Sequence, residues 1–197
     1  MSDEMTVPIM PTLLTSPRRV STPLDALLVD LDTAAHEIAA ARPRAVATAL
    51  AGHLGRPGLL APALRRSSAR SYQTNVVHVD PLGRYSLVAL VWRPGQRTSI
   101  HSHASWCVVG VHDGCEQERS FRLADGFAVE TERRTMLAGD VAAVAAGDDD
   151  VHEVRNSGTG VTISLHVYGL DYRAAGSSIL RTFAELDDAT GAGLVPR

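Results

Sequence analysis

The feature that most constrains the fold is a change of hydrophobic period near Ser71. From that point, short runs rich in Val, Ile and Thr alternate apolar with polar residues, and turn-forming residues separate the runs. Eight or more such runs follow one another without a helical pattern between them. Strands in this succession pair as antiparallel sheets, so residues 71–190 are expected to form a β-sandwich or barrel and not an α/β fold.

Residues 21–70 have a helical period and predict a small N-terminal helical layer. A threonine, a proline and an acid occupy residues 22–25 in the pattern of a capped helix start. A second, Ala-rich helix is expected from Pro43 to Gly52 or beyond, and a short one near 62–65. The predicted buried face of the first helix consists of Leu24, Leu27, Leu28, Leu31, Ala35 and Ile38.

The two chain ends are expected to lie outside the domain. Residues 1–20 are rich in Pro, Thr and Ser and predict a mobile arm, and residues 191–197 resemble the remnant of a cleavable tag. Residues 21–190 then form a single domain. We expect it to be large enough to bury a core without a disulfide or a structural metal.

Charge and hydropathy exclude several classes of function. The net charge is −3 and no basic run occurs, so neither nucleic acid nor an anionic membrane is an expected partner. No apolar stretch approaches the length of about 20 residues that a membrane-spanning helix needs. The first residues carry acids where a signal peptide carries bases, which predicts a cytoplasmic protein. Chemistry on small molecules is the leading expectation.

Three histidines form the candidate metal site. His101 and His103 are two residues apart, so on a strand both side chains project from the same face. His152 lies much later in the chain, at the start of another predicted strand. Three neutral imidazoles leave coordination positions open for a substrate, as a catalytic metal requires. An isolated pair of this kind also occurs by chance on protein surfaces, and the spacing alone does not separate iron from zinc.

The spacing around these histidines resembles the two motifs of the cupin superfamily. The first motif is matched by Gly95, His101, His103, Cys107 and Gly114. The second is matched by Gly139, Ala145, Gly147, His152 and Asn156. Cys107 stands where the usual glutamate ligand would be, and Ala145 replaces a proline. This resemblance implies a jelly-roll β-barrel, here with the N-terminal helical layer. It also implies an all-nitrogen ligand set, which leaves iron(II) its full charge and favours an anionic thiolate.

Over roughly residues 70 to 170 the sequence further resembles the cysteine dioxygenase family of thiol dioxygenases. The residues that carry the likeness are Tyr72 to Asn75, Trp92, His101 to His103, Cys107, His152 and Ser164 to Tyr168. The resemblance implies that His101, His103 and His152 hold Fe(2+), and that dioxygen is added to the sulfur of a bound thiol. Ser164, His166 and Tyr168 alternate along one strand and resemble the family's Ser-His-Tyr relay beside the iron.

Cys107 and Tyr168 have a further implied role. Animal members of the family join a cysteine at the matching position to that tyrosine by a thioether, so a Cys107–Tyr168 crosslink is a hypothesis. The alternative for Cys107 is a small buried apolar residue. The alternative for the Ser164–Tyr168 segment is a core strand whose polar groups find local partners.

Thr74 departs from the family pattern. Cysteine-specific members carry an arginine there that binds the substrate carboxylate, and an unpaired carboxylate in a closed cavity is costly. Arg173 and Arg181 are candidate replacements, since relatives acting on 3-mercaptopropionate carry a substrate-binding arginine in that region. Tyr72 and Trp92 are the other expected substrate contacts, although neither supplies a cation.

The leading hypothesis is an iron(II) dioxygenase that converts L-cysteine to cysteine sulfinic acid. Thr74 keeps 3-mercaptopropionate, a cysteamine-like thiol, a secondary-metabolite thiol and oxidation of cysteine beyond the sulfinate as alternatives. A cupin that oxidises a non-thiol acid and a non-enzymatic metal-binding cupin are the rival hypotheses. The expected partners are a small thiol and dioxygen, and the sequence leaves the oligomeric state open.

Overall fold

The computed structural model describes residues 22–186 and 193–194. The helices are α1 (Pro23–Ala35), α2 (Arg42–Ala51), the 3-10 helix η1 (Pro62–Arg65) and α3 (Tyr172–Ala175). The start of α1 follows the prediction: the Thr22 hydroxyl accepts from the Asp25 amide at 3.1 Å, and the Asp25 carboxylate accepts from the Thr22 amide at 3.1 Å. None of the described helices has the length and apolar character that crossing a membrane requires.

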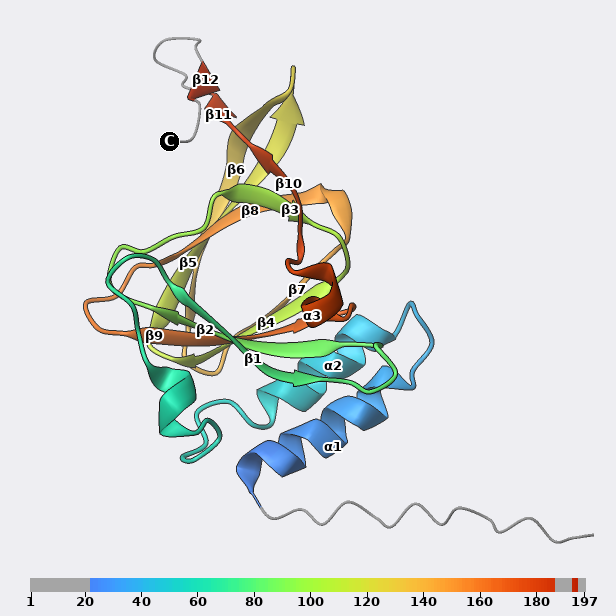
Figure 1. Ribbon diagram of the computed structural model, residues 1–197. Helices are drawn as coiled ribbons and strands as arrows, with labels where there is room; N and C mark the ends of the chain where they lie inside the picture. The colour runs from blue at the N-terminus through green and yellow to red at the C-terminus, as the bar shows by residue number, and fades with distance from the viewer. Residues whose placement is uncertain (1–21, 187–192, 195–197) are drawn as a thin grey trace, which may run out of the picture.

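Two β-sheets account for the strands of the described chain. The first contains, in spatial order, β1 (Gln73–Val79), β2 (Ser86–Trp92), β9 (Thr162–Tyr168), β4 (Cys107–Asp113) and β7 (Val141–Val144). The second contains β10 (Ile179–Phe183), β3 (Ile100–His103), β8 (Gly147–Asn156), β5 (Cys115–Ala124), β6 (Phe127–Leu137), β11 (Glu185–Leu186) and β12 (Gly193–Leu194). The sheets curl around a common interior (Figure 1). The predicted jelly-roll barrel with an N-terminal helical part is confirmed.

The five-stranded sheet is covered on both faces, which explains why β2 and β9 are buried along their whole length. Helices α1 and α2 lie against its outer face (Figure 1). Alternate residues of each strand face these helices: Leu87, Ala89 and Val91 of β2, and Ile163, Leu165 and Val167 of β9. The residues between them therefore face the barrel interior. On β9 these are Ser164, His166 and Tyr168, so the strand's pleat positions the predicted relay.

One predicted core residue is wrong. Helix α1 ends at Ala35, so Ile38 lies beyond the periodic face and is 73% exposed. The chain-end predictions concern residues 1–20 and 191–197, which lie outside the described residues except for 193–194. They stay predictions.

Candidate metal centre

The three predicted ligands converge because β3 and β8 are neighbouring antiparallel strands. His101 lies directly opposite His152 in the β3–β8 register, and a bulge separates that pair from the next one at His103. One ring nitrogen of each histidine lies within 4.8 Å of those of the other two. All three side chains are buried. Two distant segments of the sequence thus bring three imidazoles to one point.

The protonation of these rings suits a metal ion. Burial, together with His152, lowers the pKa of His101 to about 4. Burial and the neighbouring histidines lower the pKa of His103 to about 2. Near neutral pH both rings are therefore neutral, with a nitrogen lone pair to offer. His103 Nε2 lies 3.0 Å from His152 Nε2, a contact that needs either a proton or a cation between two lone pairs.

Hydrogen bonds on the far side of two rings fix which nitrogen faces the shared point. The Nδ1 of His152 lies 2.7 Å from a carboxylate oxygen of Glu118, and the Nδ1 of His101 lies 2.9 Å from the carbonyl oxygen of Ser99. An oxygen acceptor on Nδ1 selects the tautomer whose Nε2 is free to bind metal. Residues and spacing therefore fit a metal ion held by three histidines.

Glu118 is the strongest of these supporting contacts, and the sequence prediction missed it. Its side chain is buried on β5, where the other carboxylate oxygen accepts from Arg134 Nε at 2.6 Å. Burial raises the pKa of Glu118, but the hydrogen bonds and charges of His152 and Arg134 outweigh it and hold the pKa below its usual value. Glu118 is therefore an anion that orients His152.

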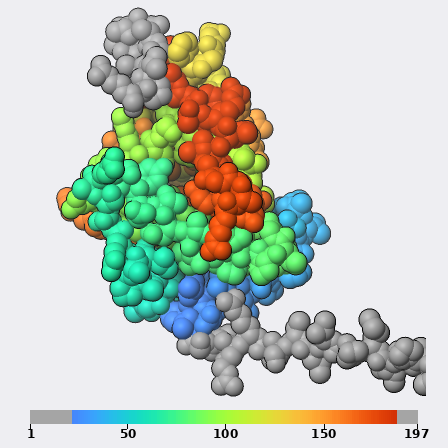
Figure 2. Space-filling view, in the orientation of Figure 1, coloured from blue at the N-terminus to red at the C-terminus, as the bar shows by residue number. Residues whose placement is uncertain are grey.

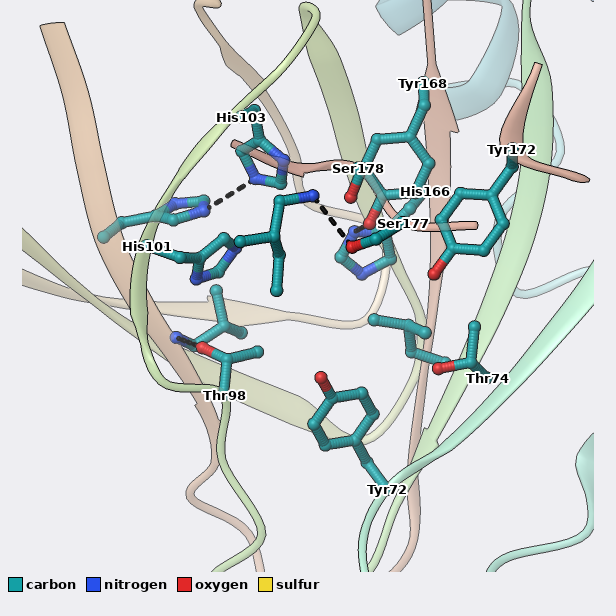
Figure 3. A pocket seen from close by; sticks show the side chains of 14 residues that line it. Tyr72, Thr74, Thr98, His101, His103, His166, Tyr168, Tyr172, Ser177 and Ser178 are labelled. Carbon is teal, nitrogen blue, oxygen red and sulfur yellow. Dashed lines mark hydrogen bonds between the residues drawn. The ribbon is translucent and has the colours of Figure 1, made fainter. Parts of the chain in front are cut away.

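A cavity of about 90 Å³ opens beside the histidines. One water molecule needs about 10–15 Å³ of such space, so the cavity suits only a small substrate. Hydroxyl groups and aromatic rings dominate the rest of its lining, which consists of Tyr72, Thr74, Leu90, Thr98, Val154, His166, Tyr168, Tyr172, Ser177, Ser178 and Ile179. Figure 3 shows Tyr72, Thr74 and Tyr172 around the space opposite His101 and His103.

The C-terminal part of the described chain supplies one wall of this cavity. Tyr172, Ser177, Ser178 and Ile179 come from α3, from β10 and from the link between them. In Figure 2 this segment lies across the visible face of the barrel, against the green strands. The sequence did not predict these lining residues, because their side chains are common on surface loops and only the path of the chain brings them inward.

Ser164, His166 and Tyr168 form the predicted chain of hydrogen bonds. The Tyr168 hydroxyl lies 3.2 Å from His166 Nδ1, and Ser164 Oγ lies 2.9 Å from His166 Nε2. Burial raises the pKa of Tyr168 well above its usual value and lowers the pKa of His166 to about 3. The chain is therefore neutral and ends at a protonated phenol in the cavity.

Trp92 and Cys107 lie behind the cavity lining. The Trp92 ring is buried against Tyr72, with ring centroids 4.4 Å apart, and its Nε1 donates to Ser164 Oγ at 3.0 Å. Trp92 thus supports the lining, whereas a direct substrate contact was expected. Cys107 lies opposite Tyr168 in the β4–β9 register, and its Sγ is 3.9 Å from His166 Nδ1.

The two arginines proposed as carboxylate partners lie outside the cavity lining. Arg173 is exposed on α3. A register shift in β10 separates Arg181 from Ile179 of the lining, and the exposed Arg181 side chain pairs with Asp148 at 2.5 Å. The family resemblance makes both arginines candidates, but neither reaches the cavity. Thr74 itself does line the cavity.

Comparison with protein families decides the relationship. The family described as cysteine dioxygenase type I matches residues 67–175, more than half of the chain. The chain belongs to the cysteine dioxygenase type I family. The matched range contains the three histidines and the Ser164–His166–Tyr168 chain. Family membership and the three-histidine cluster together indicate an oxygen-using metalloenzyme.

Solved structures resemble the barrel of this cysteine dioxygenase family member at low identity. A protein from Thermus thermophilus is 21% identical, with a TM-score of 0.45, over 55% of this chain and 91% of its own. A Klebsiella pneumoniae protein with a double-stranded β-helix domain is 24% identical, with a TM-score of 0.42, over 55% and 85%. A cupin 2 conserved barrel protein from Salinispora arenicola is 23% identical, with a TM-score of 0.41, over 57% and 85%.

Proposed function

We propose that the chain is a non-haem iron(II) thiol dioxygenase, which adds both atoms of dioxygen to the sulfur of a small thiol: RSH + O2 → RSO2H. The observation that carries this proposal is the cluster of three buried imidazoles beside a small cavity, in a member of the cysteine dioxygenase type I family. His101, His103 and His152 would hold the ion. When bound, iron(II) would supply the redox chemistry that joins oxygen to sulfur.

The protein's own groups would bind the thiol and control its proton. The buried walls exclude bulk water from all but a small volume, which strengthens every polar contact inside. The Tyr168 phenol is the hydrogen-bond donor nearest to the histidines along the relay, at a ring-centroid distance of 5.7 Å from His103. Its proton can exchange with that of a bound thiol, while His166 and Ser164 hold the phenol in place.

The cavity favours a thiol whose other end is not an ionised carboxylate. Among the described residues that line it, hydroxyls of Thr74, Thr98 and the tyrosines can donate hydrogen bonds, but none is a Lys or Arg. A buried charge without a matched partner costs about 1–3 kcal/mol or more. We therefore propose an amino thiol or a neutral thiol as the preferred substrate, ahead of L-cysteine.

Oxygen uptake and product mass across a panel of thiols test both levels of this proposal. With iron(II) restored anaerobically, we expect kcat/KM for cysteamine to exceed that for L-cysteine by about tenfold or more, since about 1.4 kcal/mol corresponds to a factor of ten. Thr74→Arg should raise kcat/KM for L-cysteine and narrow the difference. Thr135→Arg adds the same charge at an exposed position of β6 and should leave kcat/KM for L-cysteine unchanged.

Two results would count against the proposal at different levels. A wild type that prefers L-cysteine, with no response to Thr74→Arg, would overturn the substrate class and leave thiol oxidation standing. If none of the thiols in the panel supports oxygen uptake, the dioxygenase proposal itself is overturned. That result would favour a cupin that acts on a non-thiol acid, or one that only binds metal.

The Cys107 side chain carries a separate prediction. Cys107 lies opposite Tyr168 across β4 and β9, and burial raises the pKa of its thiol well above the usual value. We expect turnover to oxidise the pair to a thioether, with dioxygen as oxidant and loss of one S–H and one ring C–H hydrogen. Intact-mass measurement should show the loss of two hydrogen atoms in the wild type and none in Cys107→Ala, which should turn over more slowly but retain iron. An unchanged wild-type mass after many turnovers would reject the crosslink.

A further inference from the structure

A second buried carboxyl group, Glu116, lies on the interior face of β5. Strand residues alternate between faces, so Glu116 faces the same side as Glu118, which contacts His152. Its side chain is 1% exposed, and neither carboxyl oxygen has a hydrogen-bond partner among the described residues. Buried polar groups are nearly always paired, so an unpaired carboxyl in a folded interior calls for a role.

The polar groups that act on Glu116 belong to the far end of the relay. Interaction with the Ser164 hydroxyl and the Trp92 indole lowers the pKa of Glu116, but burial has the larger effect and raises it to about 7. Neither group makes a hydrogen bond of normal geometry to the carboxyl: the Trp92 indole donates to Ser164 Oγ, which in turn lies 2.9 Å from His166 Nε2. Glu116 therefore adjoins the relay at the end opposite the cavity.

We propose that Glu116 is the terminal proton acceptor of the chain formed by Ser164, His166 and Tyr168. An indole nitrogen only donates, so Trp92 always occupies one lone pair of Ser164 Oγ. When His166 Nε2 carries hydrogen it occupies the other lone pair, and the Ser164 O–H is then free to rotate toward Glu116. When Ser164 donates to His166 instead, that proton is withdrawn from the carboxylate. The two arrangements of the chain therefore differ in whether the Ser164 O–H is available to Glu116 or to His166.

Moving one proton converts the first arrangement into the second. The thiol S–H breaks and its proton goes to Tyr168 Oη, as the phenol proton passes to His166 Nδ1. The Nε2 proton of His166 passes to Ser164, and the Ser164 proton passes to Glu116. The net change is RSH + Glu116–COO⁻ → RS⁻ + Glu116–COOH, with every intermediate group restored to neutrality. This step rests on the proposed thiol chemistry, because the proton comes from the substrate.

Among the residues around the small cavity on β5, Glu116 is the one whose charge changes in the proposed proton transfer. It borders a cavity of about 10 Å³, close to the space that one water molecule needs. Glu118 is the other ionisable residue on the described lining, and His152 and Arg134 hold it as an anion. Val109 of β4, Met136 of β6, Ala142 of β7 and Val154 of β8 complete the lining and do not titrate.

The first test uses the metal-free protein and does not depend on activity. Glu116 holds its proton up to about pH 7 when folded, against an ordinary value of 4.5, so between these values the folded state binds more protons than the unfolded state. Stability then falls as pH rises through this window and levels off above it. Relative to Glu116→Gln, the wild-type denaturation midpoint should fall from about pH 5 to about pH 7. Met136→Leu, a volume-conserving change in the same cavity, should follow the wild type.

The second test measures kcat/KM against pH with the iron-loaded enzyme and its best thiol. Wild-type kcat/KM should rise through about pH 7 as Glu116 ionises, and Glu116→Gln should lose that rise and fall by about 100-fold at higher pH. A stability difference that does not change with pH, or a rise that persists in Glu116→Gln, would overturn the proton-acceptor role. Failure of the proposed function would look different: a wild type that oxidises no thiol while the stability difference remains.

Discussion

His152→Ala should abolish both metal retention and turnover. His152 is the ligand on β8, and its Nε2 lies 3.0 Å from that of His103, so its removal leaves two imidazoles from one short strand. Loss of an outer hydrogen-bond partner alone costs about 10- to 100-fold in metal affinity, so loss of the ligand itself should cost more than about 100-fold. Metal content after dialysis, measured with the oxygen-uptake rate, checks this prediction.

His36→Ala is the matched control for that experiment. His36 caps the C-terminal end of α1, exposed and on the far side of the five-stranded sheet from the cavity. The same chemical change there should leave metal content and turnover unchanged. Full metal retention by His152→Ala would remove this residue from the ligand set and leave the three-histidine centre without support.

The fold and the strand faces that carry the candidate ligands were predictable because strand periodicity acts locally. Side chains of His101 and His103 share a face on any strand, and the same rule aligns Ser164, His166 and Tyr168 on β9. The family resemblance supplied what periodicity cannot: that the two histidine segments meet at one ion, and that the three polar residues of β9 act as a relay. The helix start at Thr22 was equally local, since the capping residues are three apart.

The residues that sequence reasoning missed depend on contacts between distant segments. Ser177 and Ser178 reach the cavity because the chain after α3 turns back toward β3, and no local pattern records that turn. Arg181 looked suitable for a carboxylate, but the register of β10 pairs it with Asp148. A usable clue did exist in β5: Glu116 and Glu118 alternate on one face of a strand, where two acids in phase suggest a shared buried function.

Glu118 connects the metal centre to the outer surface of the barrel. It accepts from His152 on one oxygen and from Arg134 on the other, so the imidazole, the carboxylate and the guanidinium form one continuous chain. The anion makes His152 Nε2 a better electron-pair donor and holds its ring in one orientation. Because its pKa is lowered on folding, Glu118 stabilises the protein above its ordinary pKa of 4.5, and this contribution is lost as the pH falls through the lowered value.

Glu118→Gln should therefore weaken metal binding by about 10- to 100-fold while the barrel stays folded. The amide oxygen can still accept from His152, but it lacks the negative charge, and its NH2 group faces Arg134 instead of neutralising it. Metal titration of the apoprotein gives the affinity directly. Glu132→Gln makes the same change at an exposed position on neighbouring β6 and should bind metal as the wild type does. Equal affinities for Glu118→Gln and Glu132→Gln would show that the β5 carboxylate does not tune the centre, and His152 would then depend on packing alone for its orientation.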